Sequence, residues 1–178
     1  MLFRSPSSAS PPPGSPTTPT EPETLAANAG LDAIVPAEIW KDCQLQTVAE
    51  PSALQTAVCL PADGVPDRWE ISSYPNGVAL DRAYDKEIDR HKTVSRDKGE
   101  CSALSWGGEH EWVHGPGKPG GRYFCYFDGN DAVIVWTHHR FDQPSHRDIL
   151  IIAREGGSDH AGLADWWSPW HHRIGKAN

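Results

Sequence analysis

Three histidines and an aspartate lie close together after the most apolar part of the chain. His138 and His139 precede one connecting segment, His146 follows it, and Asp142 lies between them. Imidazole and carboxylate groups bind zinc, and together they can act as a general base in a hydrolase. Adjacent strand residues point to opposite faces, so only one of His138 and His139 could join the others. His138, His146 and Asp142 are therefore an alternative metal or hydrolase site, and surface histidines are the simpler interpretation.

The sequence favours a binding protein over an enzyme. It contains no G-x-S-x-G, G-x-x-x-x-G-K-[ST] or H-E-x-x-H motif. The pair Asp128 and Asp131 flanks a tight turn, where solubility and tolerance of positive φ explain both residues. We expect no enzymatic activity, no resident metal and no cofactor.

Tryptophan is the more informative side chain here, with eight copies in the chain. Trp166, Trp167 and Trp170 lie near the C-terminus on a predicted helix. Adjacent helical residues diverge by about 100°, so not all three can face inward. An exposed indole can stack on a sugar ring or a partner protein. These residues are the candidate ligand- or partner-binding site, and the alternative is that all three cover the edge of a sheet.

The four cysteines are Cys43, Cys59, Cys101 and Cys125. An even number at wide spacing, with no C-x-x-C pair, predicts two disulfides and an oxidising compartment. The alternative is four reduced, buried thiols. Three connectivities are possible, and proximity in the sequence favours Cys43–Cys59 and Cys101–Cys125.

Charge and hydropathy limit the partners of the chain. A formal net charge of −8 opposes binding to nucleic acid and to anionic lipid. No apolar run reaches the roughly 18 residues of a membrane helix, and the first residues lack the apolar stretch of a signal peptide. We expect an extracytoplasmic location, in the cell envelope or secreted, with the anchor or signal upstream of Met1. The expected partner is an unidentified envelope ligand or membrane protein.

The element that must position these residues is a hairpin. Two apolar runs, Tyr123–Phe127 and Ala132–Trp136, flank the turn Asp128–Asp131. Because neither run alternates with polar residues, both faces of this hairpin should be covered. We expect Trp136 to pack against the apolar stripe Leu80, Tyr84 and Ile88 of a predicted helix.

The remaining pattern predicts one α+β domain, in which helices pack on a mostly antiparallel sheet that meanders around the hairpin. Residues 1–30, rich in Pro, Ser and Thr, should form a disordered linker. The domain should span residues 31–170 and be followed by a frayed tail, 171–178. The predicted strands are Gln55–Leu60, Arg68–Tyr74, Cys101–Trp106, Glu109–His114 and Arg147–Ala153, with a wide turn over 115–121. The predicted helices are Pro36–Asp42, Gly77–His91 and Asp159–Trp167, the last stopped by Pro169.

Several of these residues also have a familiar spacing. They are Pro36, Cys43, Cys59, Tyr84, Cys101, Trp112, Gly121-Arg122, Cys125, Val135-Trp136-Thr137 and Trp166-Trp167. This spacing resembles the C-terminal extracytoplasmic domain attached to some actinobacterial Ser/Thr protein kinases and related membrane proteins. The resemblance covers about Leu31 to Trp167, although this chain contains neither a kinase domain nor a transmembrane helix.

The resemblance implies a sensor head with two disulfides, in which the matching positions are structural. Our leading hypothesis is a non-enzymatic, extracytoplasmic head on a flexible stalk that senses or binds a ligand or partner. The alternatives are a small secreted hydrolase with a His/Asp site and an accessory subunit of a membrane complex.

Overall fold

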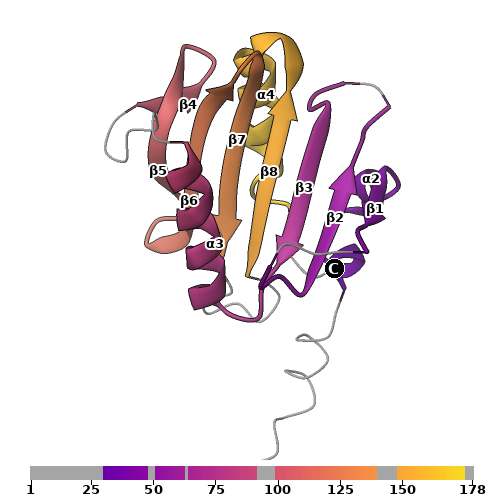
Figure 1. The fold of residues 1–178 in the computed structure, drawn as a ribbon. Coiled ribbons are helices and arrows are strands. Elements are labelled where there is room, and N and C mark those ends of the chain that lie inside the picture. Colours follow the sequence, from indigo (N-terminus) through magenta and orange to yellow (C-terminus); the bar gives the residue numbers. More distant parts are fainter. Residues whose placement is uncertain (1–29, 48–50, 63, 92–98, 140–147, 175–178) are drawn as a thin grey trace, which may run out of the picture.

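A computed structural model describes residues 30–47, 51–62, 64–91, 99–139 and 148–174. These residues form one antiparallel sheet of eight strands, in the order β1-β2-β3-β8-β7-β6-β5-β4, with helices on both faces (Figure 1). The strands are β1 (Cys43–Leu45), β2 (Gln55–Cys59), β3 (Arg68–Ser73), β4 (Glu100–Ser102), β5 (Ser105–Gly115), β6 (Lys118–Asp128), β7 (Asp131–His138) and β8 (Ile149–Glu155). The helices are η1 (Leu31–Ala33), α2 (Ala37–Trp40), α3 (Gly77–Arg90), η2 (Gly156–Ser158) and α4 (His160–Trp170). The α+β class is therefore confirmed.

The predicted hairpin is present as β6 and β7, near the middle of the sheet. Its strands pair from Tyr123 opposite Trp136 to Asp128 opposite Asp131. This register leaves Gly129 and Asn130 as a two-residue turn, and Gly129 supplies the positive φ of 63° that the turn requires. The strands β5 to β8 are sequential neighbours, which confirms the meander.

The first half of the chain joins this meander through β3. Strand β3 pairs with β8 from Arg68 opposite Arg154 to Ser73 opposite Ile149. The connection from β3 to the rest of the sheet runs through α3, which begins at an Asn76 cap. The Asn76 side chain accepts a hydrogen bond of 3.0 Å from the backbone N–H of Ala79.

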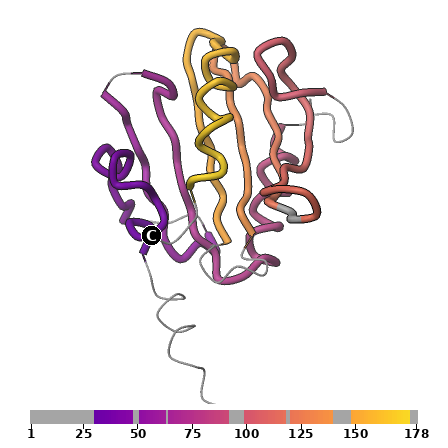
Figure 2. Tube along the Cα trace, turned by 180° about the vertical axis from the view of Figure 1, so that it is seen from behind, coloured from indigo at the N-terminus to yellow at the C-terminus, as the bar shows by residue number. Residues whose placement is uncertain are grey.

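The two faces of the sheet have separate cores. Figure 2 shows α4 running along β7 and β8 on the side opposite α3, with the N-terminal elements near β1 and β2 on the same side as α4. Ala132, Ile134 and Trp136 of β7 belong to the core on the α4 side. Val133 and Val135 belong to the other core, with the Leu80, Tyr84 and Ile88 stripe of α3.

The expectation that Trp136 packs against that stripe is therefore wrong. The indole of Trp136 instead contacts Trp166 and Trp167 of α4, at ring-centre distances of 6.1 and 6.5 Å. Alternation along a strand places Trp136 on one face, but the tertiary connections decide which helix covers that face.

The C-terminal end also differs from the expectation. Pro169 lies inside the last turn of α4, where its missing N–H removes only one helical hydrogen bond. The chain then continues in hydrogen-bonded turns, with Ile174 N–H bonded to Trp170 O at 3.2 Å. The side chains of His171 and Ile174 are buried, so the predicted frayed tail is wrong for residues 171–174. Residues 175–178 lie outside the described residues.

The wide turn expected over 115–121 is shorter in the structure. Gly115 pairs with Lys118, so only Pro116 and Gly117 form the turn. The register shifts around Val113 accommodate Pro119 within β6.

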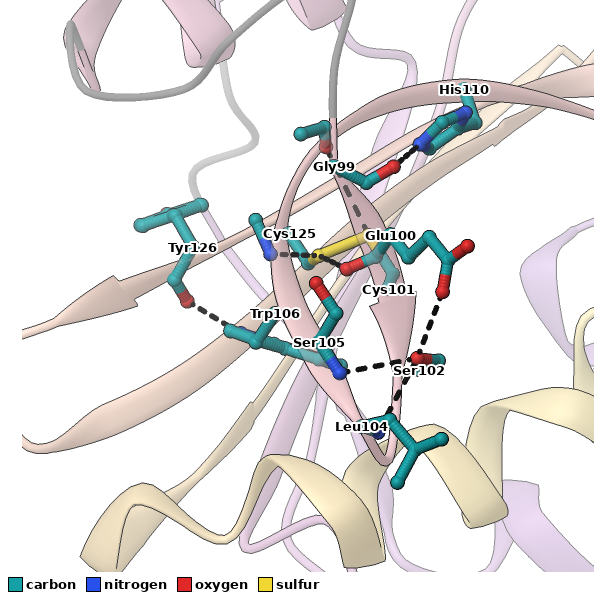
Figure 3. The surroundings of a disulfide bond; sticks show 12 residues. Gly99, Glu100, Cys101, Ser102, Leu104, Ser105, Trp106, His110, Cys125 and Tyr126 are labelled. Atoms are coloured by element: carbon teal, nitrogen blue, oxygen red, sulfur yellow. Dashed lines mark hydrogen bonds between the residues drawn. A yellow bond between two sulfur atoms is a disulfide. The ribbon is translucent and has the colours of Figure 1, made fainter.

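Both disulfides form with the favoured connectivity, Cys43–Cys59 and Cys101–Cys125. The second attaches the β4–β5 hairpin to β6 (Figure 3). In the same region, the indole N–H of Trp106 donates to the carbonyl oxygen of Tyr126 at 2.9 Å. No helix in the described part of the chain is both long and apolar enough to cross a membrane.

Candidate ligand-binding cavity

The described helices cover only part of one face of the sheet. Among the described helices, α3 alone packs on this face, where it contacts β7 and β8 and shares a core with Phe124 and Tyr126 of β6. Figure 1 shows β2 and β3 beside the helix rather than beneath it. The boundary between covered and uncovered sheet is a natural place for a ligand.

A cavity of about 340 Å³ lies at this boundary. Its lining comes from α3, β3 and β8 and from the residue after β3. The lining residues are Glu70, Ser72, Tyr74, Ala83, Glu87, Arg90, Leu150, Ile152 and Arg154.

The α3 wall of the cavity contains a buried carboxylate. Glu87 is 6% exposed, although acidic side chains are rarely buried unless they are paired. Its Oε2 accepts a hydrogen bond of 2.6 Å from Arg90, and its Oε1 lies 3.5 Å from both His91 Nε2 and the Tyr126 hydroxyl. The rings of His91 and Tyr126 stack at 3.7 Å. Burial raises the pKa of Tyr126, so this phenol keeps its proton and can donate to Glu87.

The sheet wall presents a second pair of charges. Arg154 on β8 is half-buried and donates to Asp128 at 3.0 Å. Glu70 on β3 accepts a hydrogen bond of 2.6 Å from Arg68. The cavity therefore combines two guanidinium groups with two carboxylates, and these four formal charges balance.

The charged groups of the described lining are held in place by partners. The described residues that line the cavity include no histidine or cysteine, and the hydroxyl of Ser72 is hydrogen-bonded to Thr56 at 2.8 Å. Charged groups held by their own partners provide fixed donors and acceptors for a polar ligand.

A smaller cavity of about 280 Å³ lies at the other end of α3, next to Trp112 and Arg122. Here His139 Nε2 is 3.3 Å from Asp81 Oδ1. Arg122 pairs with Glu109 at 2.5 Å and with Asp85 at 3.1 Å, and its guanidinium lies 4.4 Å above the Tyr84 ring. These contacts attach α3 to β5 and β6, so Arg122 has a structural role.

The three C-terminal tryptophans lie outside both cavities. Trp167 is buried, and Trp166 and Trp170 are partly buried against the core on the α4 side. Trp166 contacts Trp69 at 6.1 Å, and the guanidinium of Arg173 lies 4.2 Å above the ring of Trp170. The structure therefore places these residues mainly as cover for the sheet, and their role in binding stays a prediction.

His138 lies in a cluster that the sequence did not predict. It is buried at the end of β7, and its ring is 4.6 Å from that of Trp112. His114 and His171 contact the same indole, at 4.6 and 5.1 Å. His146 and Asp142 lie outside the described residues. Within the described ranges, no group of three or more His, Cys, Asp or Glu side chains is arranged to hold a metal ion.

The cavity residues were missed because each appears ordinary in the sequence. One signal was available: Glu87 follows Leu80 by seven residues and Tyr84 by three, which places it on the buried stripe of α3. A carboxylate on such a stripe indicates a polar network or a site. No family model, curated protein or solved structure matches this chain.

Proposed function

We propose that this chain is a non-enzymatic, ligand-binding head that works in an oxidising, extracytoplasmic compartment. The observation that carries the proposal is the charged cavity between α3 and the strands β3 and β8. The two disulfides support the compartment, because such bonds persist where thiols are not kept reduced.

The cavity is the proposed ligand site because it is polar, partly buried and built on regular elements. Side chains on helices and strands hold their positions better than side chains on loops. Its size is near the lower end of the range for small-molecule pockets, about 300–1,000 Å³. The ligand is therefore a single small molecule rather than a polymer.

The resemblance to kinase-associated extracytoplasmic domains adds the expectation of a sensor. Any signal from a bound ligand would pass to another polypeptide or to a further part of this one. Trp166 and Trp170 remain the proposed contact for such a partner, on the face opposite the cavity.

The test is a thermal-shift screen of small polar compounds against the wild-type chain and Arg154→Met. A ligand at a hundred times its dissociation constant should stabilise the wild type by about 2.7 kcal/mol, and Arg154→Met should lose this shift. Arg173→Met is the control, since Arg173 pairs with exposed Glu38 and lies outside the cavity lining. Equal shifts in the wild type and Arg154→Met would place the binding elsewhere and contradict the proposal.

A further inference from the structure

The charges that line the cavity indicate the class of its ligand. Arg90 and Arg154 contribute two positive charges, and Glu70 and Glu87 contribute two negative charges. A simple anion would meet the two carboxylates, and a simple cation would meet the two guanidinium groups. A ligand that carries both signs avoids either repulsion and pairs with both kinds of group.

Both walls of the cavity offer both signs. Glu87 and Arg90 belong to α3, while Glu70 and Arg154 belong to the adjacent strands β3 and β8. Arg154 faces Arg68 in the register, and Glu70 faces Ile152, so Glu70 and Arg154 are diagonal neighbours. Diagonal neighbours lie about 7–8 Å apart, within the reach of long side chains.

The sheet-wall pair retains hydrogen-bonding capacity. Arg68 contacts Glu70 through Oε1, which leaves Oε2 as an acceptor in the described structure. Arg154 donates to Asp128 through Nη1 and also interacts with Tyr126 and Glu87, and a guanidinium has five N–H donors in total. A carboxylate can therefore bind at Arg154 while an ammonium group binds at Glu70.

Between these charges the cavity has an apolar part. Ala83 of α3 and Leu150 and Ile152 of β8 contribute aliphatic surface to the lining. An aliphatic group of the ligand gains from contact with this surface, whereas a further polar group would lose its hydration there.

We propose that the ligand of this cavity is a small zwitterion, a free α-amino acid with an aliphatic side chain. Its carboxylate pairs with Arg154, its ammonium group pairs with Glu70, and its side chain lies against Leu150 and Ile152. This inference rests on the proposed function, because it names the ligand class of the same site.

Isothermal titration with three matched probes tests the ligand class. L-leucine carries both charges, N-acetyl-L-leucine lacks the ammonium group, and L-leucinamide lacks the carboxylate. L-leucine should bind, and each blocked compound should bind about tenfold more weakly or worse, since each loses one charge-assisted pair.

Two variants assign the charges. Glu70→Gln should weaken the binding of L-leucine about tenfold and leave the binding of N-acetyl-L-leucine unchanged. The affinities of these two probes should therefore become more similar. Arg154→Met should weaken both of them. Arg173→Met is the control and should bind all three probes like the wild type. Circular dichroism establishes that each variant is folded, and Glu70→Gln, which preserves side-chain shape, keeps the test open if Arg154→Met does not fold.

The possible failures are distinguishable. The proposal of a zwitterionic ligand is wrong if N-acetyl-L-leucine binds as tightly as L-leucine. It is also wrong if Glu70→Gln changes the affinity for neither probe. If no leucine probe binds but another compound of the screen does, and Arg154→Met abolishes that binding, the ligand class is wrong and the proposed function stands. If no compound binds, or if Arg154→Met has no effect, the proposed function fails as well.

Discussion

At the scale of single residues, His171 shows how strongly this fold controls a titratable group. Its imidazole is 8% exposed, stacks on Trp167 at 4.1 Å and lies 3.7 Å from the ring of His172. Its Nδ1 is 3.0 Å from the carbonyl oxygen of Trp167. Burial lowers the pKa of His171 to about 4, and the neighbouring His172 contributes in the same direction.

This shift predicts a loss of stability in mild acid. The folded chain keeps His171 neutral down to about pH 4, whereas the unfolded chain binds a proton below about pH 6.5. The contribution of the neutral His171 to the free energy of unfolding is therefore complete above pH 6.5. It is lost as the pH falls towards 4, by at most about 3 kcal/mol. Urea unfolding between pH 7.5 and 4 should show a smaller decrease for His171→Gln than for the wild type.

The matched control for this measurement is His160→Gln, which removes a histidine from the other end of α4. A decrease reduced equally in both variants would not be specific to His171. If the free energy of unfolding falls equally with pH in the wild type and in His171→Gln, then His171 has the same pKa in the folded and unfolded chains.

At the scale of elements, tryptophan side chains form most of the contact between α4 and β7. Trp136 is fully buried, and Trp166 and Trp167 meet it from α4. Trp69 of β3 contacts Trp166 as well, so a single helix binds strands from both halves of the chain. This aromatic cluster stabilises the β3–β8 junction, where the two halves of the sheet meet.

Trp136→Ala should lower the free energy of unfolding by about 3–5 kcal/mol, a large part of the total stability of a domain. Trp170→Ala, at the end of α4 and only partly buried, should cost about 1 kcal/mol, the centre of the usual range for point mutations. Chemical denaturation of both variants measures the difference. Small and equal losses would mean that α4 does not contribute to the core through Trp136.

At the scale of the whole molecule, the two disulfides lie towards opposite edges of the sheet. Cys43–Cys59 joins the edge strand β1 to β2, and Cys101–Cys125 joins the edge strand β4 to β6. Both edge strands contain only three residues, too few to hold their positions firmly by pairing alone. The disulfides therefore hold the edge strands β1 and β4 in place, while the tryptophan cluster stabilises the central strands of the sheet.

Removal of either disulfide by paired Cys→Ser substitution should cost about 3 kcal/mol by the chain-entropy model. Hydrogen exchange should accelerate first in β1 for Cys43→Ser/Cys59→Ser and in β4 for Cys101→Ser/Cys125→Ser, because only the local staple is lost.

Intact mass with and without alkylation should show four blocked cysteines in protein isolated from its own compartment. Four free thiols there would contradict the extracytoplasmic location.

Local patterns in the sequence determined most of the elements. The apolar runs around Gly129 defined the β6–β7 hairpin, and the spacing of Leu80, Tyr84 and Ile88 defined α3. These signals work because alternation and helical periodicity are properties of neighbouring residues. The four cysteines predicted two disulfides and favoured a pairing, although three connectivities remained open until the strands were placed.

Only the tertiary structure decided which face each helix covers and which distant residues meet. Trp136 lies against α4 rather than α3 because strand alternation fixes opposite faces without identifying their partners. The cavity needs Glu70, Glu87 and Arg154 from three elements that become neighbours only when β3 pairs with β8. That pairing joins residues about eighty positions apart, and no local pattern in the sequence encodes such a contact.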